Sequence, residues 1–331
     1  MIIDPAGRLR PGQRVAVRSR IATSGPGPSL TDTVGDLVTI DTDHLVIASR
    51  RGRVRIDRDD VVAARVIPPR PGRRGAPHRA IMIEDLQRLM TAGQPPIERA
   101  WIGEERRGWL LRAAQGFTGR ANSLLPVGDP GRSLDAAIDI AAAWYRERGL
   151  TPLVMLPQPE GADLRQDPLG ALLLDRGWTP SPPVLVFTAR VAAVADLPVD
   201  TSPVASSRKL SKEWFAACGP VAQARPEAAR AVMSAPEEQA FLSIGEEGLP
   251  RAIARVAFHD GWAGLFGLHV RPAARRAGLA RTLTVAAARQ ARERGIVSMY
   301  LQVEKSNAPA IALYQGLGLS LHHHYHYFSY T

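Results

Sequence analysis

The sequence predicts an α/β protein with a mixed sheet, present as two tandem copies and preceded by a small antiparallel β-barrel. From about residue 97 onward, apolar strand-like runs alternate with amphipathic helical segments, an order typical of α/β folds. Before that point, residues 11–69 hold only short runs rich in β-branched residues, separated by turn-type residues, as in a small barrel. These patterns divide the chain into a barrel of the Src-homology type (1–69), a linker with a short helix (70–96), a first α/β copy (97–190) and a second copy (191–331).

The predicted barrel strands are RVAVRSRI, DLVTID, HLVIASRRG, RVRI and VVAARVI, with SGPGPS, DTD, RRG and DRDD as turns. The segment that follows, IPPRPGRRGAPHR, is rich in Pro, Gly and Arg, and we interpret it as an exposed linker. A helix is then expected over IEDLQRLMTAG, ending on its glycine.

The two α/β copies share one order of elements, strand–helix–strand–helix–strand. The helix ending in RERG at 146–149 aligns with the helix ending in RERG at 292–295, and Gly177 aligns with Gly318. The tetrapeptide alone could match by chance, but the shared order and spacing of five elements indicate an internal repeat. In the first copy, the expected helix caps are Ser133, Gly149 and Asp167.

The segment between the copies predicts smaller elements. We expect two short helices near 210–218 and 226–234, a strand near 240–244, and a hairpin around His259-Asp260-Gly261, because Asp-Gly is a strong turn signal.

Composition limits the classes of function. The formal net charge is +10, and residues 1–80 contribute +7 of it through 15 Arg and 8 Asp. Such a segment can attract nucleic acid or acidic partners, but we favour a soluble barrel with an arginine-rich coat. Neither a signal peptide nor a membrane-spanning run is visible, so no membrane partner is expected. The single cysteine, Cys218, cannot form an internal disulfide, which favours a cytoplasmic setting; we interpret it as a small buried helix residue rather than a nucleophile.

A basic, glycine-containing loop lies between a strand ending at Val270 and a helix. It reads Arg275-Arg276-Ala277-Gly278-Leu279-Ala280-Arg281. A helix N-terminus presents free backbone N–H groups and the positive end of the helix dipole. Gly278 lets the backbone approach a phosphate closely, and the arginines add charge around it. The segment therefore predicts a pyrophosphate site.

This loop resembles the pyrophosphate loop of the GNAT superfamily of N-acetyltransferases, whose pattern is Gln/Arg-x-x-Gly-x-Gly/Ala. Arg275, Gly278 and Ala280 fill it here. Downstream, NAPAIALYQGLGL (Asn307 to Leu319) is similar to the family's N-x-x-A-x-x-L-Y-x-x-x-G-F helix, with leucine in place of the usual final aromatic. Two motifs in the expected order, on the expected elements, form a strong joint signal.

The resemblance implies that acetyl-CoA inserts between the strand ending at Val270 and the strand Ser298–Val303, which splay apart. Its pantetheine arm would bond to backbone near Leu268 and Val270, as an added strand would. Its pyrophosphate would lie on residues 275–281. Asn307 is expected to cap the following helix.

The same resemblance makes Tyr314 the general acid. It would protonate the leaving CoA thiolate as an amine attacks the thioester carbonyl. Outside this motif, a packed aromatic on an amphipathic helix would be the better interpretation. Two residues are candidates for the general base: Glu304, at the end of the strand before the tyrosine helix, and His269, on the strand facing the acetyl group. A solvated charge beside Lys305 and a core imidazole are the competing interpretations.

The first copy lacks both features. Its loop, Val127 to Ser133, contains Asp129, which would repel a phosphate, and Leu173 stands where the second copy has Tyr314. We interpret this copy as a degenerate half that keeps the fold. In the tail HHHYHYFSY, alternating histidines could suggest a metal site, but imidazoles on a straight strand are too far apart to share one ion easily, so no metal is expected.

Two functions remain open. The first is an acetyl-CoA-dependent N-acetyltransferase acting on a primary amine of a small molecule or a protein. The alternative is a non-catalytic, acyl-CoA-sensing regulatory protein whose basic barrel binds nucleic acid or a protein partner. The acceptor and the oligomeric state are not encoded in any recognisable motif.

Overall fold

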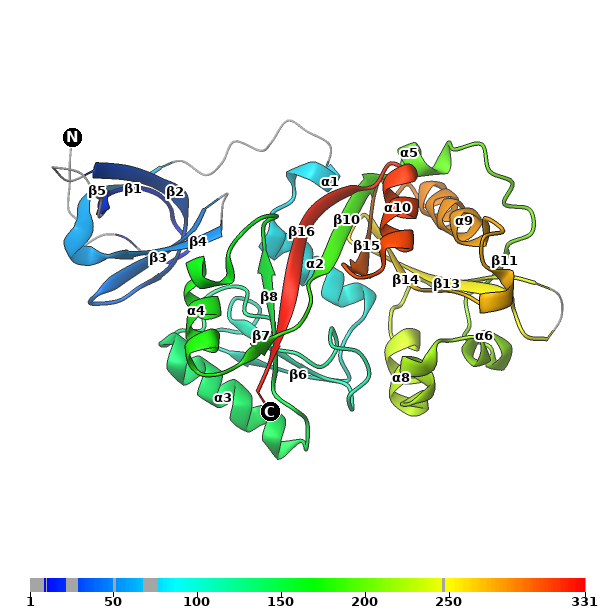
Figure 1. Cartoon of the computed structure of the whole chain (residues 1–331), viewed down its shortest axis with the longest axis horizontal. Helices are drawn as coiled ribbons and strands as arrows, with labels where there is room; N and C mark the ends of the chain where they lie inside the picture. Colours follow the sequence, from blue (N-terminus) through cyan, green and yellow to red (C-terminus); the bar gives the residue numbers. More distant parts are fainter. Residues whose placement is uncertain are drawn as a thin grey trace.

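The computed structural model describes residues 9, 11–21, 29–49, 52–67, 77–245 and 248–330, and Figure 1 shows their arrangement. The predicted turns at 24–28 and 50–51 and most of the predicted linker, 68–76, lie outside the described residues. The N-terminal strands form a unit at one end of the molecule, beside a larger body that contains the rest of the chain.

The N-terminal unit is a five-stranded antiparallel sheet in the order β4-β3-β2-β1-β5. Apolar side chains alternate along its strands, so Val15, Val17, Leu37, Leu45 and Ile47 meet in one small core. Within the described residues the sheet curls without closing, because β4 and β5 are not paired. This confirms the predicted small barrel-like domain. Its strands are β1 (Arg14–Ile21), β2 (Ser29–Ile40), β3 (His44–Ser49), β4 (Gly52–Asp57) and β5 (Val61–Val66).

The body is built on one nine-stranded mixed sheet, ordered β11-β12-β13-β14-β15-β10-β16-β8, with the short β9 paired to β16. The strands are β8 (Leu153–Gln158), β9 (Thr179–Pro180), β10 (Val184–Arg190), β11 (Ala205–Ser207), β12 (Gln239–Ile244), β13 (Ala252–His259), β14 (Trp262–Val270), β15 (Ser298–Glu304) and β16 (Ser320–Ser329). A two-stranded ladder, β6 (Glu98–Ile102) with β7 (Trp109–Ala113), extends it through the isolated bridges Leu110–Leu125 and Leu124–Val154. The predicted mixed α/β fold in tandem is confirmed.

The two halves exchange their last strands. β10, which belongs to the first half by sequence, lies between β15 and β16 of the second half. In return, β16 lies between β10 and β8 of the first half. In Figure 1 the red β16 and the green β10 run side by side through the centre of the body. The sheet therefore crosses from one half to the other without a break.

The helices of the two halves end in the same way, as the repeat predicts. Gly149 and Gly295 adopt φ of +63° and +72° after α3 and α9, a conformation that glycine takes at little cost. The helices that follow match too: Trp178 N–H donates to Leu173 O, as Leu319 N–H donates to Tyr314 O. The helices of the body are α1 (Pro77–Ala80), α2 (Ile83–Gly93), α3 (Leu134–Glu147), α4 (Pro168–Asp175), α5 (Val191–Ala195), α6 (Lys212–Ala216), α7 (Pro220–Gln223), α8 (Pro226–Ser234), α9 (Leu279–Glu293) and α10 (Ala308–Gly316).

Alternation along the strands separates two apolar layers over the second half of the sheet. Residues such as Leu242 and Leu265 pack with α5, α9 and α10 on one face. Phe241 and Ile253 pack with α6, α7 and α8 on the other face. Helix α2 crosses the centre of that second face and contacts both halves, since Leu86 shares a cluster with residues of β7, β8 and β15. The site described below lies where β14 and β15 separate, so that it is open to both faces.

Helix α2 covers IEDLQRLMTAG and ends on Gly93, as predicted. The glycine has a packing role as well, since a Cβ there would clash with Tyr300 Oη and with Phe266 Cζ (2.6 Å). It permits close packing of helix on sheet. The second strand predicted in GWLLRAAQGFTGRANSLLPV is reduced to the two isolated bridges at Leu124 and Leu125.

Residues 77–79 end the predicted exposed linker, but they belong to helix α1. In this helix His78 is buried, and its carbonyl accepts a hydrogen bond from the Thr188 hydroxyl (2.8 Å). Among the helices of the described residues, none is both long and apolar enough to cross a membrane.

Candidate functional site

β14 and β15 separate halfway along their length. They pair in parallel only from Trp262–Leu265 with Ser298–Leu301. Beyond this point β14 bends, since its register with β13 shifts between Ile253 and Arg255 and Gly267 adopts φ +57°; such a bulge turns a strand away from its neighbour. The far edge of β14, Phe266–Val270, thus has no strand partner on the β15 side within the described chain.

The loop after β14 presents its backbone to solvent. Arg276 and Gly278 both have positive φ, +67° and +75°, and α9 starts directly after Gly278. In the described part of the chain, the backbone N–H groups of residues 276–281 donate to no protein acceptor. Arg275, Arg276 and Arg281 are exposed beside them. Consecutive free N–H groups with adjacent cations form a suitable binding surface for a pyrophosphate.

Tyr314 lies on α10, on the α9 face of the sheet. Its side chain is 7% exposed and belongs to the apolar cluster that includes Leu265 and Leu301, the last residues before the strands separate. Burial raises the pKa of its hydroxyl to about 12. The hydroxyl forms no hydrogen bond within the described residues, so its proton is available to a ligand.

The other residues singled out from the sequence surround this opening. Leu268 and Val270 lie on the unpaired part of β14 and are half-buried. Asn307 caps α10 as predicted, because its side chain accepts the Ala310 N–H (3.2 Å). Glu304 is exposed at the end of β15, opposite Val184 of β10.

His269 lies on the opposite side of the sheet from Tyr314. A Cβ added to Gly219 would lie 3.7 Å from its Nδ1, so the imidazole faces the loop before α7. Desolvation lowers the pKa of His269, and the charge of Arg275 lowers it further. The ring is therefore neutral near pH 7 and can accept a proton.

A cavity of about 250 Å³ opens on the His269 side, at the bulge of β14. Its walls come from both halves of the chain: Phe117, Thr118 and Arg120 of the first half, and residues of α6, α7, α8 and strands β13 and β14 of the second half. Trp214 and Phe266 supply apolar wall, and Gly219 lies at the edge shared with His269. The cavity thus adjoins the point where β14 leaves β15.

Two arginines without carboxylate partners line this cavity. Arg255 is 2% exposed, and it donates to Gly93 O (2.8 Å) and Gln239 Oε1 (3.1 Å). Arg120 donates to Tyr325 Oη (3.1 Å) and Gln94 Oε1 (3.1 Å). Every partner is neutral. Arg112, close by, is buried as well and bonds to Ser123. Buried charges are normally paired.

The first half fills the corresponding site with its own groups. At the loop before α3, Asp129 Oδ1 accepts the Gly131 N–H (2.8 Å) and Ser133 Oγ accepts the Ala136 N–H (3.3 Å). The barrel contacts the adjoining segment, since Arg53 donates to Pro126 O (2.8 Å). A cavity of about 580 Å³ remains between the β2–β3 hairpin and this loop.

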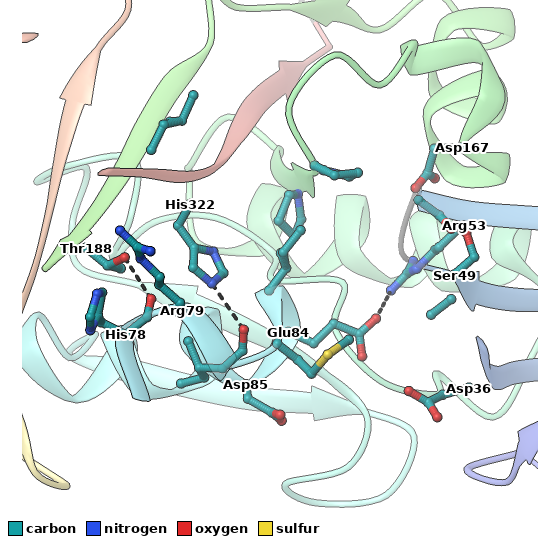
Figure 2. Close-up of a pocket in the computed structure, with 18 of the residues that line it drawn as sticks. Asp36, Ser49, Arg53, His78, Arg79, Glu84, Asp85, Asp167, Thr188 and His322 are labelled. Carbon is teal, nitrogen blue, oxygen red and sulfur yellow. Dashed lines mark hydrogen bonds and ion pairs between the residues drawn. The ribbon is translucent and has the colours of Figure 1, made fainter. Parts of the chain in front are cut away.

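Figure 2 shows a further cavity, of about 570 Å³, between the barrel and the body. Arg53 reaches Glu84 across it (3.6 Å), and His322 Nε2 donates to the Ile81 carbonyl (3.1 Å). Asp36, Asp85 and Asp167 also line it, together with Arg79 and His78. Because its lining mixes both charges, this cavity does not select a ligand of one sign.

The histidines of β16 have protein partners: His322 and His323 contact each other through their Nδ1 atoms (2.8 Å), and others bond elsewhere. His323 is fully buried and bonds to Gln87 Nε2 (2.7 Å), whereas His326 bonds to Ser181 O (2.8 Å). Among the described residues, the group with metal-compatible spacing is Asp41, Asp43 and His44 in the β2–β3 turn. There Asp41 accepts two backbone N–H groups of the turn itself, which accounts for its position.

Of the residues lining the cavity, the sequence singled out only Cys218; the prediction of a buried helix residue is wrong, because Cys218 is half-buried and lies between α6 and α7. Arg255 carried a detectable signal, since it is the charged residue inside the apolar run Ala252–Phe258, which alternation alone would make inward-facing. Arg120 carried none, because it lies in a loop rich in glycine and polar residues.

Comparison with known proteins relates the chain to acetyltransferases. Residues 81–328 match a family model described as "Probable histone acetyltransferase Rv0428c C-terminal", and residues 9–65 match one described as "Rv0428c N-terminal Sm-like domain". Over 156 residues the chain is 36% identical to the probable histone acetyltransferase Rv0428c of Mycobacterium tuberculosis. That match covers 46% of this chain and 47% of the relative, so it spans about half of the relative's length.

Solved structures share the fold. A GCN5-related N-acetyltransferase from Kribbella flavida is 15% identical, with a TM-score of 0.55, over 75% of this chain and 95% of that chain. A tandem GNAT protein from the clavulanic acid biosynthesis pathway is 15% identical, with a TM-score of 0.50, over 78% of this chain and 90% of that chain. At these identities the similarity establishes the GNAT fold and its tandem form.

Proposed function

The chain belongs to the family described as probable histone acetyltransferase Rv0428c, and we propose that it is a cytoplasmic N-acetyltransferase that transfers acetyl from acetyl-CoA to a primary amine. One observation carries this proposal: the separated strands β14 and β15 lead directly to a loop whose backbone N–H groups at 276–281 are free. The unpaired edge of β14 can bind the amide groups of the pantetheine arm of acetyl-CoA. The loop can bind the pyrophosphate of the same molecule. The cytoplasm is where such a co-substrate is supplied.

We assign the co-substrate contacts residue by residue. The backbone of Leu268 and Val270 would bind the pantetheine. The pyrophosphate would lie on Arg275, Arg276, Ala277, Gly278, Leu279, Ala280 and Arg281, and Asn307 would hold the start of α10. By this assignment, residues 191–331 carry catalysis and residues 97–190 form a degenerate half whose phosphate loop is closed by Asp129 and Ser133.

The proposed reaction uses groups on both sides of the gap between β14 and β15. The amine nitrogen attacks the thioester carbonyl carbon, the C–S bond breaks, and the amine gives up one proton. Tyr314 donates its proton to the departing thiolate, since its hydroxyl is buried, protonated and unbonded. His269 or Glu304 accepts the proton from the amine. The neutral imidazole of His269 at the cavity edge supports the first of these.

Replacement of Tyr314 by phenylalanine tests this proposal. We expect kcat for CoA thiol release to fall about a hundredfold or more, with the Kd of acetyl-CoA unchanged. Tyr330→Phe, which alters an exposed tyrosine, is the matched control and should retain full activity. Unchanged turnover in Tyr314→Phe would contradict the acid role. Tight acetyl-CoA binding without transfer to any amine would instead favour a non-catalytic acyl-CoA sensor whose basic barrel contacts a partner.

A further inference from the structure

The cavity at the β14 bulge has a definite charge. Arg120 and Arg255 line it, and the lining contains neither Asp nor Glu. In the described part of the chain, neither arginine forms an ion pair. The lining of the cavity is therefore positively charged.

The two arginines differ in what they can offer a ligand. Arg255 is held by Gly93 and Gln239 and lies over the Phe266 ring, 4.6 Å from its centroid. It supplies a fixed charge. Arg120 uses Nε and Nη1 for Tyr325 and Gln94, while its Nη2 donates to no acceptor within the described residues. A guanidinium that is oriented by two neutral partners and keeps a free edge is suited to a carboxylate.

Arg120 also lines a separate void of about 10 Å³, and a second unpaired donor, Gln302, lies there. Gln302 follows Leu301, the last residue of β15 that pairs with β14, and its Oε1 accepts the Tyr325 hydroxyl (2.9 Å). Its Nε2 is buried and has no partner within the described residues. Gln302, Tyr325, Arg120 and Gln94 thus form one hydrogen-bonded chain, with spare N–H donors at Gln302 and Arg120. Because Gln302 does not line the cavity at the β14 bulge, this chain serves to position Arg120, whose free Nη2 is the donor offered to a ligand there.

We propose that this cavity is the acceptor site and that the acceptor is a small primary amine bearing a carboxylate, which Arg120 binds in the field of Arg255. The proposal rests on the acetyl-transfer function proposed above and names its substrate class. The volume of about 250 Å³ suits a compact molecule, and Trp214 with Phe266 would contact its carbon chain. A lysine-rich protein segment is disfavoured, because like charges repel.

The positive field also bears on the proton that the amine must lose. A neighbouring cation disfavours the protonated form of an amine and lowers its pKa. An acceptor held by its carboxylate beside Arg120 and Arg255 would therefore reach its nucleophilic state more easily. This reduces the demand on the general base, in keeping with a cavity that contains no carboxylate of its own.

Matched pairs of acceptors test the proposal with the full-length protein and acetyl-CoA. Glycine is compared with glycinamide, and 4-aminobutanoate with butylamine; a lysine-rich peptide serves as the cationic arm. We expect kcat/KM to be about ten- to a hundredfold higher for the carboxylate member of at least one pair, as for the loss of one charged hydrogen bond. Arg120→Gln should remove this preference and leave the Kd of acetyl-CoA unchanged, and Arg120→Lys should restore part of it. Arg99→Gln, at an exposed arginine on β6, is the control and should behave as wild type.

The outcomes separate this inference from the proposed function. Equal turnover of carboxylate and amide partners, or preference for the lysine-rich peptide, would overturn the inference while leaving acetyl transfer intact. If no amine is acetylated, calorimetric titration with 4-aminobutanoate and butylamine decides: carboxylate-selective binding that Arg120→Gln abolishes supports the anion site although the proposed function fails. Absence of such binding, together with absence of turnover, overturns both.

Discussion

His269 has the properties of a proton acceptor at the edge of the cavity. Desolvation and Arg275 lower its pKa from the ordinary value of 6.5, and a lowered pKa keeps an imidazole neutral to lower pH. We therefore predict that kcat/KM falls as pH decreases through a step lying below pH 6.5. His269→Gln should lower kcat at pH 7.5 by about a hundredfold and remove this step from the pH–rate profile. The acceptor's own deprotonation contributes a separate step at higher pH.

His324 provides the control for this measurement. It is half-buried on β16, away from the cavity lining, and burial lowers its pKa to about 4. His324→Gln should leave the profile unchanged. Should the step survive in His269→Gln but vanish in Glu304→Gln, the base would be Glu304 instead.

At the residue scale, the sequence was informative where function follows a local motif. Tyr314 and Asn307 stand at fixed positions of one motif, so the resemblance of that motif to the GNAT helix singled them out. The acceptor cavity is different. Arg120 and Arg255 are 135 positions apart in the chain, and only the packing of the first half against β13 and β14 brings them together. No local pattern encodes such a meeting.

At the element scale, the N-terminus of α9 depends on the left-handed conformation of Gly278. Its φ is +75°, and a Cβ added there meets no atom within 4 Å, so substitution causes backbone strain without a clash with the protein. We predict that Gly278→Ala lowers the free energy of unfolding by about 1 kcal/mol. The added methyl would lie beside the free N–H groups, so the Kd of acetyl-CoA should rise about tenfold. Denaturant titration and calorimetry measure the two effects.

Gly295 separates strain from binding. It lies at the other end of α9, with φ +72° and open space around a Cβ. Gly295→Ala should cost the same stability but leave acetyl-CoA affinity unchanged. Equal loss of affinity in both variants would mean that α9 as a whole, rather than its phosphate loop, determines binding.

Most elements were predictable because their ends carry strong local signals. Ser133 and Asp167 cap their helices as expected, and the Asp260-Gly261 turn has positive φ at both positions, +47° and +74°. The sequence could not predict that the second strand of the first half makes so few backbone pairs. Residues 124 and 125 form only single bridges, and the number of pairs that a strand makes depends on distant neighbours rather than on its own sequence.

At the scale of the whole molecule, the exchange of β10 and β16 could not be inferred from the sequence. Each strand follows the second helix of its own half, as the repeat predicts. Strand order in space depends on nonlocal pairing, and both β10 and β16 are buried enough to suit a central position. The consequence is that neither half has a complete sheet of its own.

The strand exchange predicts that the halves fold only together. A fragment of residues 191–331 would lack β10, leaving β15 with an open edge and β16 without either of its neighbours, β10 and β8. Open apolar edges promote aggregation. We expect fragments 77–190 and 191–331 to be aggregated or unfolded when expressed alone, and to form one folded complex when refolded together. Size-exclusion chromatography with circular dichroism checks this.

A cut between the barrel and the body is the matched control, because residues 14–66 and 77–330 each keep all their strand pairs. Residues 77–331 should therefore remain folded and unfold in a single transition, since α2 and the continuous sheet bind both halves into one core. A monomeric, folded 191–331 fragment with its own cooperative transition would contradict the exchange. Even then, the acceptor cavity would need the 77–190 fragment, because that fragment supplies Arg120. Adding the 77–190 fragment to the folded 191–331 fragment should restore acetyl transfer without changing the free energy of unfolding of the 191–331 fragment.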